Sequence, residues 1–159
     1  MVYFFEILLA TVSFAYNDEV MSESRYLYLA KAQESLAGAQ SEASQGRYNN
    51  SANRSYYACF QAAIAALQHA GITPPGGGQN WSHAFVQSAF VGELINRRKL
   101  YPARLRQALM RNMSLRHAVD YESDAVSQVQ AERSVQRSRE VVNAVAERMR
   151  PDEELPRRS

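Results

Sequence analysis

Apolar residues recur at steps of three and four along most of the chain from residue 22 onward, which is the spacing typical of amphipathic α-helices. Ser22 or Ser24 can cap the start of a first helix, because a serine oxygen accepts hydrogen bonds from the first free backbone amides. Gly46 suits its end. The buried stripe predicted for this helix is Leu29, Ala32, Leu36, Ala39 and Ala43.

A second helix is predicted from about Asn50 to Ala70, with Gly71 as its end. Its apolar positions cover most of the helix circumference, and a helix of that kind is buried on most sides. These positions are Ala52, Tyr56, Cys59, Phe60, Ala63, Ile64, Leu67 and Ala70. We therefore expect this helix to lie at the centre of the fold.

The remaining pattern predicts a loop and then three further helices. Prolines and glycines fill residues 73–78 and cannot sustain a helix. Ser82 can cap a third helix, Pro102 suits the first turn of a fourth, and a break at 120–124 precedes the last. The last stripe is Val126, Val129, Val135, Val142 and Val145. The sequence predicts an all-α fold, an up-and-down bundle of four to five helices, with two long helices forming an antiparallel hairpin.

The first part of the chain differs from the rest. An apolar run over residues 1–16 is interrupted by Glu6, and no Lys or Arg precedes Arg25. A secretory signal normally starts with a positive segment, and a membrane span needs about 20 apolar residues. The favoured interpretation is that translation begins at Met21; an added docking helix or strand and a membrane anchor stay open as alternatives. We expect no membrane partner.

Length and composition add a few limits. A chain of 159 residues fits one domain, so we expect residues 1–21 to be an N-terminal extension, 22–150 the helical domain and 151–159 a solvated tail. Eighteen basic and sixteen acidic residues are too balanced to indicate a nucleic-acid or membrane partner from charge alone. The single cysteine, Cys59, excludes an intrachain disulfide and a cysteine-based zinc site. We expect a cytoplasmic protein with no metal and no cofactor.

Three polar residues in the middle of the chain are candidate binding residues. Arg54 and Tyr57 are three residues apart and share a face of the predicted second helix. They either tie this helix to its neighbours or form one wall of a groove for RNA or nucleotide. His83 follows the glycine-rich loop in the first helical turn, where the helix dipole disfavours its protonation. It is either a core or capping residue, or a binding residue beside a mobile lid.

A third group of polar residues lies between residues 111 and 121. Asn112, Arg116 and Asp120 are spaced by four and share one helix face, where Arg116 and Asp120 can form an ion pair. Arg111 and His117 indicate a sharper alternative, metal-independent RNA cleavage. An arginine would stabilise charge developing on the phosphate, while a histidine would transfer the proton of the 2′-hydroxyl.

Three segments together resemble the HEPN domain family. They are GRYNNSANRSYYACFQAAIAAL at 46–67, WSH at 81–83 and RHAVDY at 116–121, and the resemblance extends over residues 22–149. It is strongest to small stand-alone HEPN proteins encoded beside a minimal nucleotidyltransferase. It implies a homodimer in a toxin–antitoxin-like module, with a nucleotidyltransferase-domain protein as partner and RNA or nucleotide as ligand. The candidate binding residues are Arg54, Tyr57, His83, Arg116, Asp120 and Tyr121.

Catalytic HEPN proteins are metal-independent ribonucleases in which an arginine and a histidine are separated by four to six residues, with a polar residue directly after the arginine. Arg111, Asn112 and His117 match this Arg-x5-His pattern. Six helical steps turn His117 about 240° away from Arg111, so the two meet only if the helix breaks or a second copy contributes. In another branch of the family the arginine and the Asp-Tyr pair recur without the histidine, and Arg116 is then the equivalent arginine. A nucleotidyltransferase-binding module and a ribonuclease toxin both stay open.

Overall fold

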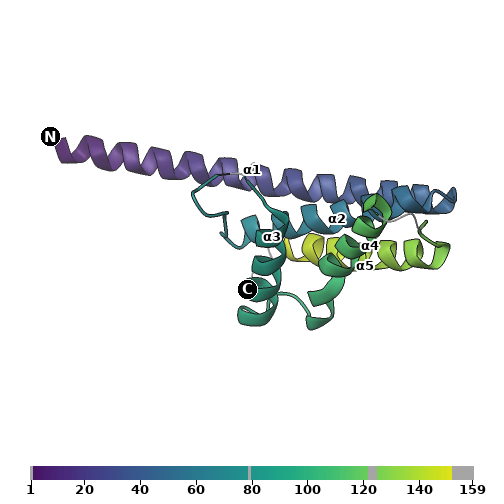
Figure 1. Cartoon of the computed structure of the whole chain (residues 1–159). Helices are drawn as coiled ribbons and strands as arrows, with labels where there is room; N and C mark the ends of the chain where they lie inside the picture. Colours follow the sequence, from purple (N-terminus) through teal and green to yellow (C-terminus); the bar gives the residue numbers. More distant parts are fainter. Residues whose placement is uncertain (1, 79, 122–124, 152–159) are drawn as a thin grey trace, which may run out of the picture.

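The computed structural model describes residues 2–78, 80–121 and 125–151, and within these ranges it contains helices and connecting segments but no strand. The predicted all-α bundle is therefore confirmed. Its three long helices are α1 (Val2–Ser44), α2 (Tyr48–His69) and α5 (Gln128–Arg148), which lie along one another (Figure 1). The shorter elements are α3 (His83–Ala89), the π-helical η1 (Phe90–Arg97), the 3-10 helix η2 (Ala103–Gln107) and α4 (Ala108–Tyr121).

The helices α1 and α2 form the antiparallel hairpin that the sequence predicts. The turn between them needs a backbone conformation that glycine adopts readily, and Gly46 supplies it with a φ of 73°. The Arg47 amide then donates to the Glu42 carbonyl and closes the end of α1. Helix α5 runs antiparallel to α1, since Val126 lies beside Asn49 at the turn and the carbonyl of Met149 accepts a hydrogen bond from the Tyr26 hydroxyl at the other end.

The start of α1 differs from the prediction. The helix runs without a break from Val2, so the expectation that Ser22 or Ser24 caps its N-terminus is wrong. Ser24 instead accepts a hydrogen bond from Nε2 of Gln68, 2.9 Å away on α2. The first turns of α1 project past the rest of the bundle (Figure 1). None of the described helices combines the length and hydropathy needed to span a bilayer.

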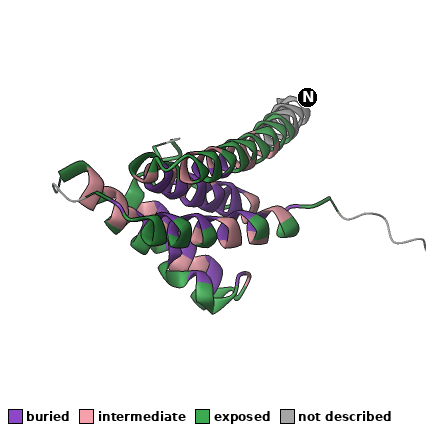
Figure 2. Ribbon diagram, turned by 90° about the vertical axis from the view of Figure 1, so that its right-hand side faces the viewer, coloured by how far each residue is buried: buried purple, intermediate pink, exposed green. Residues whose placement is uncertain are grey.

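Helix α2 occupies the centre of the bundle, as predicted, and is the most buried element (Figure 2). In α1, Ala32, Leu36 and Ala39 are buried as the stripe predicts. In α5 the expectation fails at Val129, which is 52% exposed. The buried face of α5 instead includes small residues such as Ala131 and Ser134, and this face leaves Val129 outside the core.

The segments after the proline-glycine loop follow the predicted caps. Ser82 accepts a hydrogen bond from the amide of Phe85 and caps α3, as expected. The helix then continues into η1 with π-helical geometry, which the periodicity does not predict. Helix α4 ends at Tyr121, and residues 122–124 of the predicted break lie outside the described residues, as does most of the predicted tail, 152–159. Ser127 and Gln130 form a capping box at the start of α5.

Candidate functional site

Helices α2, α3 and α4 bring aromatic residues and an arginine together in what we call the Arg116 cluster: Tyr56, Tyr57, Phe60, His83 and Arg116. The guanidinium of Arg116 lies over the rings of Tyr56 and Tyr57, 5.2 and 4.9 Å from the two centroids. Such cation–π contacts are strongest where water is partly excluded, and the Arg116 side chain is 25% exposed. The two tyrosines therefore hold this guanidinium in one place at the edge of the bundle.

His83 forms the other side of the cluster. Its Nδ1 is hydrogen-bonded to the Tyr56 hydroxyl, and its ring centroid lies 4.7 Å from that of Phe60. Phe60 also stacks on Tyr56, with 5.9 Å between centroids. Ser82, through its cap of α3, fixes the turn from which His83 projects. The predicted binding residues Tyr57, His83 and Arg116 are thus brought together.

Burial and neighbouring charge set the protonation of this cluster. Partial burial against Tyr56 and Phe60 lowers the pKa of His83, and the charges of Arg116 and His117 lower it further. Burial raises the pKa of Tyr56 to about 12, although Arg116 opposes this. Near neutral pH His83 is therefore uncharged and Tyr56 keeps its proton. Arg116 remains as the fixed positive charge.

Asp120 lies beside the Arg116 guanidinium but does not accept a hydrogen bond from its Nε. Its Oδ2 lies 3.4 Å from Nε of Arg116, close enough for the predicted ion pair. The buried Nε nevertheless makes no hydrogen bond to any described residue. Tyr121, the last of the predicted binding residues, is 82% exposed and stacks on His117, with 5.7 Å between the ring centroids.

A polar groove between α1 and α2 adjoins the cluster. Its volume is about 360 Å³, and it is lined by Ser35, Asn50, Asn53, Arg54, Tyr57 and Gln61. Tyr57 belongs both to this groove, which Arg54 also lines, and to the Arg116 cluster. Arg54 crosses α1 at Gly38, where an added Cβ would lie 3.0 Å from its Cδ. The glycine therefore leaves the space that the arginine stem occupies.

The three residues of the Arg-x5-His pattern point to different surroundings. Asn112 is fully buried, and its amide donates to Ser138 Oγ at 3.0 Å and to the Ser134 carbonyl at 3.2 Å. Arg111 lines a groove between α4 and α5, whereas His117 lies near His83 on another side of the helix. Because α4 is unbroken from Ala108 to Tyr121, Arg111 and His117 of one chain do not converge.

Some residues of these sites were not predicted as site residues. The stripe of α2 placed Tyr56 and Phe60 in the core, although both contact His83. Their spacing of four was the available signal, since it puts two aromatic rings on one face. Arg133 and Arg137, which lie in the α4–α5 groove, were also missed. Their spacing of four on α5 was again a signal.

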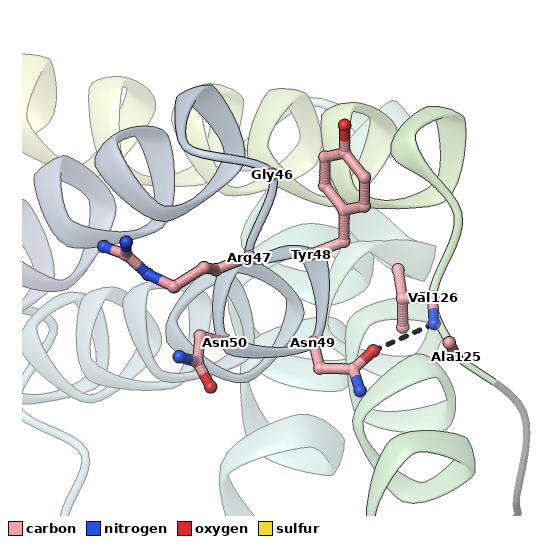
Figure 3. A pocket seen from close by; sticks show the side chains of 7 residues that line it. All are labelled: Gly46, Arg47, Tyr48, Asn49, Asn50, Ala125 and Val126. Atoms are coloured by element: carbon pink, nitrogen blue, oxygen red, sulfur yellow. Dashed lines mark hydrogen bonds between the residues drawn. The ribbon is translucent and has the colours of Figure 1, made fainter.

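A further pocket lies at the turn between α1 and α2 (Figure 3). Asn49 points towards the segment before α5, and its Oδ1 accepts a hydrogen bond from the Val126 amide at 2.9 Å. Arg47 forms an ion pair with Glu42, which also accepts a hydrogen bond from Asn50. These polar groups are bonded to other residues of the protein. They connect the α1–α2 turn to the end of α1 and to the segment before α5.

Comparison with known families gives a match to the greater part of the chain. A model of the HEPN domain family matches residues 26–149, which is most of the chain. Comparison with curated proteins found no similar sequence. Among the described residues, no group of three His, Cys, Asp or Glu side chains is arranged to hold a metal ion.

Proposed function

Because the chain belongs to the HEPN domain family, we propose that it is a cytoplasmic, homodimeric HEPN protein that binds RNA or nucleotide beside a nucleotidyltransferase partner in a toxin–antitoxin-like module. The observation that carries the binding part is the position of Arg116 over Tyr56 and Tyr57, next to the Arg54 groove. The partner and the homodimer rest on family membership.

The chemistry of this surface suits a phosphate with an attached base. A guanidinium presents a planar fork of donors that matches phosphate oxygens, and the Arg116 side chain is partly open to solvent. Tyrosine faces stack on unpaired bases in single-stranded RNA, and Tyr57 is only half-buried. Arg54 offers a second positive charge in the groove that Tyr57 also lines. A short single-stranded segment or a nucleotide can therefore contact both arginines and Tyr57.

The test measures binding of fluorescein-labelled single-stranded RNA and of ATP to the wild-type protein and to Arg116→Ala. Each lost phosphate contact removes a charge-assisted hydrogen bond, so we expect affinity for at least one ligand to fall by about tenfold. Arg116→Lys keeps the positive charge but loses the planar set of donors, so its affinity should lie between those of the wild type and of Arg116→Ala. Arg104→Ala is the control, since Arg104 is an exposed arginine outside the cluster. Equal affinity of the Arg116→Ala and Arg104→Ala variants contradicts the proposal.

The homodimer has its own measurement. Sedimentation equilibrium of the purified chain at micromolar concentration should give twice the mass of one chain, which is 17.9 kDa. Co-expression with a nucleotidyltransferase encoded next to it should yield a complex that purifies together. A monomer that captures no such partner contradicts this part of the proposal and leaves ligand binding to the first test.

A second candidate function is metal-independent RNA cleavage. It is favoured by the position of two histidines, His83 and His117, close to the fixed charge of Arg116. With its Nδ1 accepting a hydrogen bond from Tyr56, the uncharged His83 carries its proton on Nε2 and can donate it to a leaving oxygen, while a guanidinium stabilises charge on the phosphate. The alternative set of Arg111, Asn112 and His117 would need two copies of the chain, because they diverge within one.

Cleavage of RNA in EDTA distinguishes these possibilities. Loss of cleavage in His83→Ala and Arg116→Ala, with Arg111→Ala still active, supports the Arg116 cluster. Loss in Arg111→Ala and His117→Ala, with His83→Ala active, supports the Arg-x5-His pattern. If a folded wild-type dimer cleaves none of the RNAs supplied, the ribonuclease function is wrong and binding remains.

A further inference from the structure

A second groove with concentrated positive charge lies on another side of α4, where it packs beside α5. Its volume is about 400 Å³ and it is open to solvent. We call it the α4–α5 arginine groove. Its lining is Arg111, Ser114, Leu115 and Ala118 from α4 with Gln130, Arg133 and Arg137 from α5. Neither Tyr57 nor Arg116 contributes to it, so it is distinct from the Arg116 cluster.

None of the three arginines of this groove forms an ion pair with a described acidic residue. Across residues 2–78, 80–121 and 125–151, the ion pairs of the protein involve other arginines. Burial lowers the pKa of Arg137, and the like charges of Arg111 and Arg133 lower it further. Three cations whose fields overlap in this way repel one another. A bound anion would relieve that repulsion.

One of these arginines is held rigidly from inside the protein. Nε of Arg137 donates a 2.7 Å hydrogen bond to Oδ1 of the buried Asn112. The same oxygen accepts a hydrogen bond from the Ser134 hydroxyl. An arginine already fixed in position loses less conformational entropy when it binds a ligand. The core thus pre-organises a guanidinium that lines an open groove.

We propose that the α4–α5 arginine groove binds the phosphates of a single-stranded nucleic acid. Arg133 and Arg137 lie one turn apart on α5, so they can contact successive phosphates along the groove. Leu115 and Ala118 give it an apolar wall for the sugar faces. An open groove with a row of cations fits a strand better than it fits one enclosed nucleotide. The inference goes beyond the proposed function, which needs only the Arg116 cluster.

The experiment uses fluorescence anisotropy of a labelled single-stranded RNA at several salt concentrations. The groove variant is Arg111→Ala/Arg133→Ala, which leaves Arg137 and Asn112 in place. The control is Arg104→Ala/Arg150→Ala, which also removes two positive charges, from exposed arginines outside the groove. Each lost phosphate contact with a single strand lowers the slope of log affinity against log salt by about 0.7, so we expect a fall of about 1.4 and an affinity loss of tenfold or more. The control should keep the wild-type slope.

The other outcomes assign the binding elsewhere. Equal slopes for the groove variant and the control overturn the proposal. If Arg116→Ala alone abolishes RNA binding, the groove is wrong and the proposed function stands; the reverse result supports the groove and contradicts the Arg116 cluster. If the groove variant loses ATP binding but keeps RNA binding, the ligand is a free nucleotide. If it keeps RNA binding but loses self-association, the groove faces a second copy of the chain.

Discussion

His83 shows how one side chain takes its properties from three helices. Its ring packs against Phe60 and Tyr56 of α2, while the positive charge of Arg116 on α4 opposes its protonation. The neutral ring can accept the hydrogen bond from the Tyr56 hydroxyl at Nδ1, whereas a protonated ring would have to donate there. The protonation of a single imidazole is therefore linked to how α3 packs on α2.

This linkage predicts a pH dependence of stability. The pKa of His83 is lowered from its ordinary value of 6.5, so below that pH the unfolded chain binds a proton that the folded chain resists. The free energy of unfolding should therefore fall as the pH drops through 6.5 and level off below the folded-state pKa. Urea unfolding at a series of pH values measures it.

The control for this prediction is His83→Gln, which removes the titrating ring. The pKa of His69 is also lowered by burial, so some slope will remain in the variant. The difference between wild type and variant isolates the contribution of His83. Parallel curves over the whole acid range would show that His83 is not linked to folding in this way.

At the scale of elements, Asn112 connects three helices through one buried amide. It lies on α4 and bonds to Ser134, Arg137 and Ser138 of α5, while its nitrogen lies 3.4 Å from Sγ of Cys59 on α2. The Ser138 hydroxyl in turn donates a hydrogen bond to the carbonyl of Ser55, also on α2. A satisfied polar network of this kind fixes how helices sit against one another.

We expect Asn112→Ala to lower the free energy of unfolding by about 2–3 kcal/mol, because it leaves buried groups of Ser134 and Arg137 without their partner. Ser114→Ala, two residues along the same helix and exposed, should change it by less than about 0.5 kcal/mol. Chemical denaturation measures both. Equal stability of the two variants would show that the network does not hold α4 in place.

The elements themselves could be predicted because their signals are local. The stripe of α1, the cap at Ser82 and the turn at Gly46 each depend on a few neighbouring residues. The failures came where tertiary packing decides: Ser24 bonds to Gln68 across the bundle instead of capping a helix, and Val129 lies off the buried face. Arg116 was recognised as a candidate, yet its position over Tyr56 depends on how α4 crosses α2.

At the scale of the whole molecule, the bundle proper begins well inside α1. The described side chains of residues 13–20 are exposed, while those of Tyr28 and Leu29 pack against the core. We expect a chain that starts at Met21 to unfold at nearly the same denaturant concentration as the full chain, with a change of under about 1 kcal/mol.

A longer deletion is the comparison for this truncation. Removing residues 1–28 also removes Ser24 and Tyr26, which bond to Gln68 and to the Met149 carbonyl. That chain should be clearly less stable by the same measurement. If the chain starting at Met21 is destabilised as much as the longer deletion, residues 1–20 belong to the folded domain and are not an extension.

The length of α1 also affects how the molecule moves in water. Its 43 residues extend roughly 64 Å at about 1.5 Å per residue, against roughly 33 Å for the 22 residues of α2. A body with one such long dimension rotates faster about that axis than end over end. The backbone N–H bonds of a helix lie nearly parallel to its axis. The orientation of those in α1 is therefore changed mainly by the slow, end-over-end rotation. Their nuclear spin relaxation would therefore differ from that of the amides in α3, even with both helices equally rigid.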